Sequence, residues 1–456
     1  MGTDTVDLLV IGGGMAGLSA AARVAAEGGS VVLVEKADRT GGSARFAGFL
    51  WTATTVEELR RVNPEGDPEL AAALVGGFAD AVAWVRSLGV ECRPPVPVLG
   101  FGRGHQVDTN HYLDTCERLL RDRGQEVLTG TWTRTLRTAN GRVTGAECLM
   151  PDGSARRIEA TWTLLATGGF QGDPELRARH LHPQAADVGL RANPHSRGDG
   201  LALGRAVGAG FGRKDAGFYG HLMPAGVSLA DPARFVDLAL YYSEHALLFD
   251  TTGERFADET VGDHLTAMAL LDRPQARGLL VADARVHREW ISASYVEGIP
   301  GVDKFQLCHR AGARCAVADD LEDFASMPEE WGYPGAVIRD RVKEFNATAA
   351  SGGVPAPGRL LDSRPLDEPP FYVIEVAPAV TFTFGGLLID SAARVLSGPG
   401  DAGADGCRPV PGLLAAGADA GGLYRRAYAG GLAPALVFGL AAARTALAGK
   451  PTADDR

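Results

Sequence analysis

The segment that most constrains this chain runs from Val6 to Lys36. An apolar run at 6–11 leads into three glycines at GxGxxG spacing, Gly12, Gly14 and Gly17, and an alanine-rich stretch follows. Glycine at these positions permits a tight turn, close approach of the backbone to a pyrophosphate, and close packing of a helix on a strand. The N–H groups at the start of the helix would then face the phosphates. The segment therefore predicts a strand, a glycine turn and a helix that bind a dinucleotide.

An acidic residue closes this segment. A second apolar run, at 30–34, ends in Glu35, which lies 18 residues after Gly17. In dinucleotide-binding folds an acid about 20 residues further on hydrogen-bonds to the adenosine ribose, so we expect Glu35 to do the same. The pattern leaves FAD and NAD undecided. The candidate cofactor-binding residues of the segment are Gly12, Gly14, Met15, Ala16, Gly17, Glu35 and Lys36.

Composition narrows the class of protein. A chain of 456 residues with 45% hydrophobic and 22% charged residues indicates a globular protein of two or three domains. The net charge of −11 argues against a nucleic-acid partner. We find no basic leader before an apolar core and no apolar run long enough to cross a bilayer, so we expect no membrane insertion and a cytoplasmic protein.

The six cysteines carry no metal signature. None of them has CxxC spacing, which argues against iron–sulfur, c-type haem and zinc sites, and we expect no metal. Cys308 and Cys315 flank the basic stretch CHRAGARC, which we interpret as two free thiols near a turn.

Glycine-rich segments recur along the chain after the first one. In order they are GGSARFAG from Gly41, ATGGF from Ala166, RGDGLALGRAVGAG, GERFADE, TFTFGGLLID and YAGG. With the opening segment, this series resembles the FAD-binding flavoprotein family of fumarate reductase, succinate dehydrogenase, 3-ketosteroid dehydrogenase and tricarballylate dehydrogenase. The resemblance covers nearly the whole chain in the family's order.

The resemblance implies a fold and a cofactor. The fold class would be α/β with an α+β cap: a Rossmann-like FAD-binding domain with an inserted capping domain, as in fumarate reductase flavoproteins. The FAD domain would comprise residues 1–215 and 368–456, and the cap residues 216–367. FAD would be bound non-covalently, because no histidine occupies the second glycine turn. The further cofactor-binding residues that the resemblance implies are Gly41, Gly42, Ser43, Gly48, Ala166, Thr167, Gly168, Asp199, Gly417, Asp419 and Leu432.

A three-stranded β-meander is expected inside the FAD domain. Residues 129–158 alternate β-branched and polar residues around two turn signals, Asn140–Gly141 and Asp152–Gly153. Such alternation around an Asn-Gly pair is a strong hairpin pattern.

Three departures from the fumarate-reducing members bear on the substrate. Those members carry an arginine four residues after the glutamate of their RFxxE motif, whereas here Glu259 is followed at that distance by Asp263. They also place a histidine and an arginine at positions that here hold Phe382 and Tyr428. We therefore expect a substrate that is larger and less charged than a dicarboxylate.

Tyr428 resembles the tyrosine with which ketosteroid-type desaturases polarise the substrate carbonyl. A phenol is a neutral donor at pH 7 and suits that role. The alternative is a tyrosine that only packs at the start of a helix. Arg425 and Arg426 could hold a substrate carboxylate as forks, or form a solvated basic pair.

Hydride transfer next to a carbonyl also needs a group that carries a proton. The candidates are His221, Tyr242, Asp263 and His264. Histidine titrates in the right range without special tuning. Adjacent residues on a helix point about 100° apart, so Asp263 and His264 would act together only if both faced the same cleft. For each candidate a purely structural role is the competing interpretation.

Three functions remain open. The first is an FAD-dependent dehydrogenase that desaturates a carbon–carbon bond next to a carbonyl in a small or medium organic molecule. The second is an ene-reductase that runs the reverse reaction with an external electron donor, and the third is a non-redox or isomerase role with structural FAD. We find no second nucleotide fingerprint and no haem or iron–sulfur motif, so we expect a diffusible electron acceptor such as oxygen or a quinone.

Overall fold

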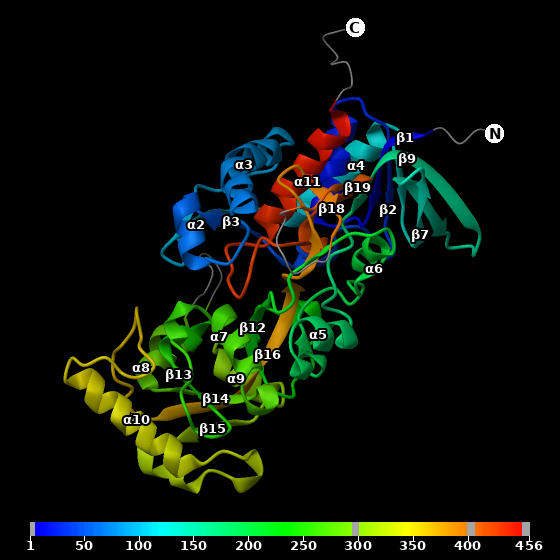
Figure 1. Cartoon of the computed structure of the whole chain (residues 1–456). Coiled ribbons are helices and arrows are strands. Elements are labelled where there is room, and N and C mark those ends of the chain that lie inside the picture. The colour runs from blue at the N-terminus through cyan, green and yellow to red at the C-terminus, as the bar shows by residue number, and fades with distance from the viewer. Residues whose placement is uncertain (1–4, 294–300, 399–405, 449–456) are drawn as a thin grey trace. The chain divides into compact units, whose positions relative to one another are not determined.

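The computed structural model describes residues 5–293, 301–398 and 406–448, and the chain divides into two compact units (Figure 1). The first unit comprises residues 1–181, 192–218 and 382–456, and the second comprises 182–191 and 219–381. The inserted unit thus begins and ends a little later than residues 216 and 367, and it also includes 182–191. The reason is strand pairing, because Gly189 and Leu190 pair with Ala379 and Val380 in the sheet of the second unit.

A mixed sheet with a parallel centre forms the core of the first unit. Its strand order is β18-β19-β9-β1-β2-β6. β1 pairs in parallel with β2 and β9, β2 with β6, and β9 with β19, whereas β18 is antiparallel to β19. These strands are β1 (Val6–Ile11), β2 (Val31–Val34), β6 (Glu126–Leu128), β9 (Ala155–Leu165), β18 (Arg394–Leu396) and β19 (Pro409–Ala415). The Rossmann-like arrangement expected from the opening segment is confirmed.

Helix α1 (Met15–Ala26) is almost wholly buried and packs against α11 (Leu432–Leu447) and α4 (Thr109–Asp122) (Figure 1). Small residues allow the close approach to α11, where a Cβ on Gly439 would lie 2.5 Å from the carbonyl oxygen of Ala16. Ser19 Oγ and the hydroxyl of Tyr112 lie 2.7 Å apart and join α1 to α4. The other helices of this unit are α2 (Val56–Val62), α3 (Pro68–Ser87), α5 (Pro174–His180) and α6 (Asp199–Ala206).

The predicted β-meander is present. β7 (Trp132–Ala139) and β8 (Arg142–Leu149) form a hairpin whose turn residues, Asn140 and Gly141, both have positive φ (50° and 75°). The third strand of the meander is β9, which pairs with β8 on one side and continues into the central sheet. β9 therefore runs past residue 158, where the predicted meander ends, and leads directly into the ATGGF turn.

Two small three-stranded sheets complete the first unit. One has the order β3-β5-β4, and the other β11-β17-β20. Their strands are β3 (Phe49–Ala53), β4 (Val96–Val98), β5 (Gly102–Gln106), β11 (Phe211–Gly212), β17 (Gly386–Leu388) and β20 (Ala420–Gly421), and the short 3₁₀ turns η1 (Gly42–Phe46) and η10 (Gly417–Asp419) precede β3 and β20.

The second unit is built on a six-stranded sheet with the order β10-β16-β14-β13, and β12 and β15 also pair with β16. Side chains alternate between its faces: Leu248, Leu280 and Ile374 belong to one hydrophobic cluster, and Phe249 and Val281 to the other. The strands are β10 (Gly189–Leu190), β12 (Phe218–Pro224), β13 (Leu247–Asp250), β14 (Gly278–Ala282), β15 (Cys315–Ala318) and β16 (Phe371–Thr383).

Helices and short helical turns cover both faces of this sheet. The α-helices are α7 (Asp263–Leu271), α8 (Ala284–Val286), α9 (Lys304–Arg310) and α10 (Gly335–Ala350). The short turns are η2 (Pro183–Ala186), η3 (Pro232–Arg234), η4 (Tyr241–His245), η5 (Glu259–Val261), η6 (Pro274–Ala276), the π-helical η7 (His287–Ile291), η8 (Leu321–Ser326) and η9 (Glu329–Trp331).

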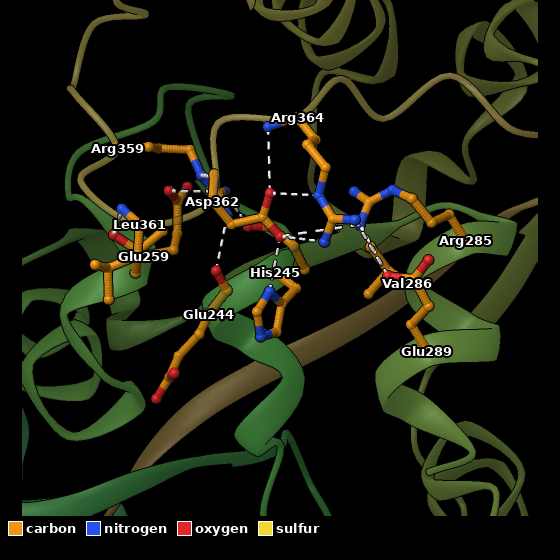
Figure 2. A network of polar contacts seen from close by, with 12 residues as sticks. Glu244, His245, Glu259, Arg285, Val286, Glu289, Arg359, Leu361, Asp362 and Arg364 are labelled. Atoms are coloured by element: carbon orange, nitrogen blue, oxygen red, sulfur yellow. Dashed lines mark hydrogen bonds and ion pairs between the residues drawn. The ribbon is translucent and has the colours of Figure 1, made fainter. Parts of the chain in front are cut away.

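A network of ion pairs ties the GERFADE segment to the end of the insertion (Figure 2). Glu259 is buried and pairs with Arg255 at 2.7 Å and with Arg359 at 3.4 Å. Asp362 accepts from His245 Nδ1 at 2.8 Å and pairs with Arg364 at 3.1 Å. These contacts give the RFxxE residues Arg255 and Glu259 a structural role within the second unit.

Helix α3 corrects one expectation. It has 20 residues and a mean hydropathy of 1.3, so by length and composition it could cross a bilayer, contrary to our reading of the sequence. In the structure its apolar residues serve packing: a Cβ on Gly77 would lie 2.9 Å from Val437 of α11.

Candidate active site

The three glycines of the opening segment have different surroundings. A Cβ on Gly12, whose φ is +108°, would lie 2.2 Å from the carbonyl oxygen of Ala166, and one on Gly17 would lie 1.9 Å from that of Gly12. Packing within the protein therefore requires both glycines. A Cβ on Gly14 would meet nothing closer than the carbonyl oxygen of Gly41, at 4.0 Å. The space beside Gly14 is therefore left open by the protein.

The open space lies at the start of α1. Gly14 is the N-cap residue, no side chain caps the helix, and its first turn contains no acidic residue. The backbone N–H groups and the positive end of the helix dipole are therefore available to an anion. Met15 and Ala16, the first residues of the helix, are buried. This donor set fits a pyrophosphate.

Glu35 supports the glycine turn from the end of β2. Its Oε2 accepts from the N–H of Gly13 and its Oε1 from the N–H of Ala37, both at 2.8 Å. A carboxylate oxygen can accept more than one hydrogen bond, so the expected bond to ribose remains compatible with this geometry. The ribose contact stays a prediction.

The second glycine turn lies against the first. The N–H of Gly41 donates to the carbonyl oxygen of Gly13 at 2.7 Å, and a Cβ on Gly42 would lie 3.7 Å from Gly14. Ser43 Oγ accepts from the N–H of Asn193 at 3.2 Å. Two segments predicted separately to bind FAD are thus adjacent in the structure.

Other predicted cofactor residues pair with one another or with the backbone. Lys36 Nζ forms an ion pair with Asp199, the first residue of α6. Gly48 directly precedes β3 of the β3-β5-β4 sheet, and its carbonyl oxygen accepts a hydrogen bond from the N–H of Val107 at 2.9 Å. Asp199 and Lys36 therefore reach the same place from segments far apart in the sequence.

Asp419 holds the turn that follows β9. Its Oδ1 accepts from the hydroxyl of Thr167 at 3.0 Å and from the N–H of Gly169 at 3.2 Å, and its Oδ2 accepts from the N–H of Thr167. Burial raises the pKa of Asp419, and the charge of Asp199 adds to this effect. Gly200 completes the contact, since a Cβ there would lie 2.3 Å from the Asp419 carboxylate. Here Asp419 binds the protein backbone.

The remaining predicted cofactor residues lie near the starts of α1 and α11. Gly417 has a φ of +69°, and a Cβ on it would lie 3.3 Å from Ala16 Cβ. Leu432 begins α11, whose N-terminus has no side-chain cap and no acidic residue in its first turn. Gly168, at φ +99°, and Ala166 belong to the turn after β9. The residues present therefore fit a dinucleotide bound beside the starts of α1 and α11 and the turn after β9.

Tyr428 lies in an aromatic cluster of the first unit. Its ring centroid is 5.3 Å from that of Trp51, 6.2 Å from Phe382 and Tyr424, and 6.4 Å from Phe384. The two glycines after it fix the backbone, because a Cβ on Gly430 would lie 2.0 Å from the carbonyl oxygen of Trp51. The surroundings of the Tyr428 ring are therefore aromatic side chains, among them the phenol of Tyr424.

In the second unit His221 and Asp263 form a buried pair. His221 Nδ1 lies 2.6 Å from Asp263 Oδ2, and the side chains are 4% and 8% exposed. Burial lowers the pKa of His221, although the Asp263 charge acts in the opposite direction. Burial also opposes ionisation of Asp263, but the charge interaction and hydrogen bond with His221, with smaller contributions from His264 and Arg191, outweigh it and hold the pKa of Asp263 below its usual value. Near pH 7 the pair is therefore a neutral imidazole and a carboxylate.

The other two predicted proton carriers differ from this pair. His264 is buried next to Asp263, and burial lowers its pKa to about 4. Tyr242 belongs to the hydrophobic cluster beside β12, and burial raises its pKa well above the usual value. The ring of its neighbour Tyr241 does meet His221, at a centroid distance of 5.3 Å, as does the ring of Tyr219 at 4.9 Å.

Sequence reasoning missed Tyr241, Arg191 and Glu244. Arg191 donates to the Tyr241 hydroxyl at 3.4 Å. Burial and the charge of Asp263 raise the pKa of Glu244 to about 7, and its side chain points away from the network around Asp362 (Figure 2). Only the adjacency of Tyr241 to Tyr242 could have drawn attention to this group.

Arg425, considered above as a carboxylate fork, forms an ion pair with Glu65. Its backbone N–H also donates to Asn63 Oδ1 at 3.1 Å. This arginine is therefore already matched by an acid of the first unit.

Comparison with known proteins agrees with a dinucleotide-binding site in the first unit. Residues 7–432 match the family described as FAD binding domain. The chain is 24% identical over 468 residues to probable fumarate reductase Ifc3 of Shewanella frigidimarina, covering 96% of this chain and 74% of that protein. It is 29% identical over 334 residues to 4-oxocyclohexanecarboxylate 2-dehydrogenase of Sinomonas cyclohexanicum, covering 67% of this chain and 54% of that protein.

The fold is shared with a solved structure, 3-ketosteroid delta1-dehydrogenase from Sterolibacterium denitrificans. The TM-score is 0.77 at 20% sequence identity, with 98% of this chain and all of that chain covered (100%). The glycine turns, the free N-terminus of α1 and the family match all point to the same cofactor. The chain therefore belongs to the FAD binding domain family and is an FAD-dependent oxidoreductase.

Proposed function

We propose that this oxidoreductase desaturates a carbon–carbon bond next to a ketone carbonyl in a small or medium organic molecule. The observation that carries the proposal is the aromatic cluster of Tyr428, Phe382, Phe384, Tyr424 and Trp51. An apolar ketone gains from burial against such rings, whereas a dicarboxylate would need paired cations there. Two of the relatives are, by name, dehydrogenases of ring ketones.

FAD, held beside Gly14 at the start of α1, would supply the hydride acceptor for the β carbon of the ketone. Tyr428 would donate a hydrogen bond to the substrate carbonyl oxygen. This bond strengthens as negative charge develops on that oxygen, so it lowers the barrier more than it tightens substrate binding. The surrounding rings exclude water and strengthen the interaction further.

His221 would accept the proton from the α carbon. Because Nδ1 donates its hydrogen to Asp263, the lone pair of the neutral imidazole lies on Nε2. Asp263 would hold this tautomer and stabilise the imidazolium that forms. His221 is therefore the proposed base, and Asp263 a positioning residue.

The second candidate is the reverse reaction, reduction of an unsaturated ketone with an external electron donor. It is supported by the names of several relatives, which are reductases, the probable fumarate reductase described above among them. For the forward reaction we propose a diffusible acceptor, oxygen or a quinone, and we expect a cytoplasmic protein.

An anaerobic experiment distinguishes these directions. The oxidised holoenzyme is mixed with saturated cyclic ketones, and loss of the flavin absorbance is followed. Bleaching supports the desaturase. If the oxidised enzyme stays coloured but the chemically reduced enzyme is reoxidised by the unsaturated ketone, the protein is a reductase. If the flavin absorbance changes in neither experiment, a non-redox role is favoured.

A further inference from the structure

The second unit contains two buried cations that no carboxylate neutralises directly. Arg191 is 7% exposed and Lys304 is 8% exposed. Within residues 5–293, 301–398 and 406–448, neither has an acidic side chain at ion-pair distance. Isolated buried charges are costly, and natural proteins usually pair them.

The guanidinium of Arg191 makes hydrogen bonds of 3.2 to 3.4 Å, all of them to neutral groups. Its acceptors are the carbonyl oxygen of Phe235 at 3.2 Å, Thr381 Oγ1 at 3.4 Å and the hydroxyl of Tyr241 at 3.4 Å. The guanidinium also lies 5.5 Å from the ring of Phe235. The part of the chain that the structure describes thus supplies three weak acceptors to a group with five N–H donors.

Lys304 lies beside the same tyrosine. Its Nζ donates to the carbonyl oxygens of Val236 at 2.7 Å and Asp237 at 3.1 Å, and it sits 5.3 Å from the centroid of the Tyr241 ring. Burial lowers the pKa of Lys304; the charge of Asp237 opposes this effect, and the charge of Arg191 adds to it. Both cations therefore converge on Tyr241.

Other buried arginines of the second unit follow the usual rule. Arg359 pairs with Glu259 at 3.4 Å, and Arg255 pairs with the same acid at 2.7 Å. Elsewhere in this unit, then, a buried arginine is paired with a buried carboxylate. At Arg191 the acid that acts on the cation is the more distant Asp263, which is already hydrogen-bonded to His221, and at Lys304 it is Asp237, which is also not at ion-pair distance.

We infer that Arg191, Lys304 and Tyr241 form a binding site for a carboxylate of the substrate. The substrate would then be a ketone that also bears an acid group, an inference that rests on the proposed function. A guanidinium can bind both oxygens of a carboxylate, and the lysine adds a third charged donor. Tyr241 also touches His221, at a ring distance of 5.3 Å, so the acid group would be bound beside the proposed base.

Binding can be measured without turnover. The probe is cyclohexanecarboxylate, which has no ketone, and its neutral match is cyclohexanecarboxamide. Calorimetric titration of the holoenzyme should show the acid binding about tenfold or more tightly than the amide. Arg191→Gln should weaken binding of the acid about tenfold or more and change binding of the amide little.

The matched control is Arg288→Gln, an arginine of the same unit that is exposed and paired with Glu368 at 3.1 Å. This variant should bind both probes like the wild type. Equal affinity of the wild type for acid and amide, or an unchanged acid affinity in Arg191→Gln, would overturn the proposal. If Arg191→Gln does not fold, Lys304→Gln provides the same comparison, and Arg191→Lys, which keeps the charge but loses the planar fork, should weaken binding of the acid less.

The same experiment separates this inference from the proposed function. Acid-selective binding lost in Arg191→Gln supports the carboxylate site even if no ketone bleaches the flavin. Desaturation of a ketone ester at the same KM as its free acid would exclude the site while leaving the desaturase in place.

Discussion

The ring of Phe382 lies 6.2 Å from the ring of Tyr428, although 46 positions separate them in the sequence. Both stand where the resemblance to fumarate-reducing proteins leads one to expect charged, carboxylate-binding side chains. The two replacements are therefore adjacent, and together they change the same part of the first unit from cationic to aromatic. Replacement of both residues is what we expect if the substrate group bound here is not a carboxylate.

Tyr428→Phe tests the proposed carbonyl donor. It removes one hydroxyl and keeps the ring that packs on Trp51, so the fold should be retained. We expect the rate of anaerobic flavin bleaching by a saturated ketone to fall about 10²–10³-fold. The matched change Tyr424→Phe removes a hydroxyl that donates to the carbonyl oxygen of Gly430 at 2.9 Å and should affect the rate much less. Equal rates for Tyr428→Phe and wild type would exclude the role.

Gly14→Ala separates cofactor binding from folding. Gly14 has a φ of −81°, which alanine adopts freely, and its Cβ would meet no protein atom closer than 4.0 Å. The apoprotein should unfold at the wild-type midpoint, while FAD affinity should fall about tenfold or more because the methyl group occupies the space beside the helix N-terminus. Both quantities follow from FAD titration and thermal unfolding.

Gly17→Ala is the contrasting variant. Its Cβ would lie 1.9 Å from the carbonyl oxygen of Gly12, so we expect the apoprotein itself to lose more than about 2 kcal/mol of unfolding free energy. If the two variants behave alike, the open space beside Gly14 does not belong to the cofactor.

Asp263→Asn tests the positioning of His221. The neutral imidazole is the active form of a base, so kcat/KM should fall as the pH drops through the His221 pKa, which burial places below its ordinary value. The Asp263 charge raises that pKa, so its removal should shift the acid limb to still lower pH. The rate at the plateau should fall about tenfold or more as well, because the imidazolium loses its partner. A pH profile identical to that of the wild type would remove Asp263 from the mechanism.

His264 should make the protein less stable in mild acid. Its pKa is about 4 when folded, below the value of about 6.5 in an unfolded chain. As the pH falls from 6.5 towards 4, the unfolded chain binds a proton that the folded protein does not, so the stability due to this residue is present above pH 6.5 and is lost below it. Between pH 7 and 5 the loss should be about 2 kcal/mol.

Urea unfolding at pH 7 and pH 5 measures this effect, which should shrink in His264→Gln. Glu244 acts in the opposite sense, because its raised pKa of about 7 gives stability that is present at low pH and lost as the pH rises through 7. Glu244→Gln therefore provides the control: it should steepen the acid loss, and an unchanged slope in both variants would contradict the two pKa shifts.

The sequence predicted those parts of the fold that local patterns determine. The GxGxxG turn, the two strands beside it and the Asn140–Gly141 hairpin depend on residues close together in the chain, and all are present. The strand β9 continues beyond residue 158, where the predicted meander ends, because the change from an amphipathic to a wholly buried strand in Ala155–Leu165 breaks the alternation on which the prediction relied.

The candidate site was less accessible to sequence reasoning. The pairing of His221 with Asp263 joins residues 42 positions apart, and only the fold brings them to 2.6 Å. Arg191 follows no recognisable motif, and its burial without an acid is a property of three-dimensional packing. In η4 the conformation of a single turn determines that Tyr241, and not Tyr242, lies beside His221. Amino-acid composition does not specify that conformation.

The Asp419 carboxylate has a consequence for how the protein is made. It secures Thr167 across 252 residues of sequence. On the ribosome, domains generally fold from the N-terminus as they emerge, but this turn has no anchor until the late segment is synthesised. The nascent chain must therefore wait with the edge of β9 uncovered, since β19, which pairs with it, is also translated late. The turn after β9 can therefore reach its native geometry, and take part in holding flavin, only once the segment that contains β19 and Asp419 has been synthesised.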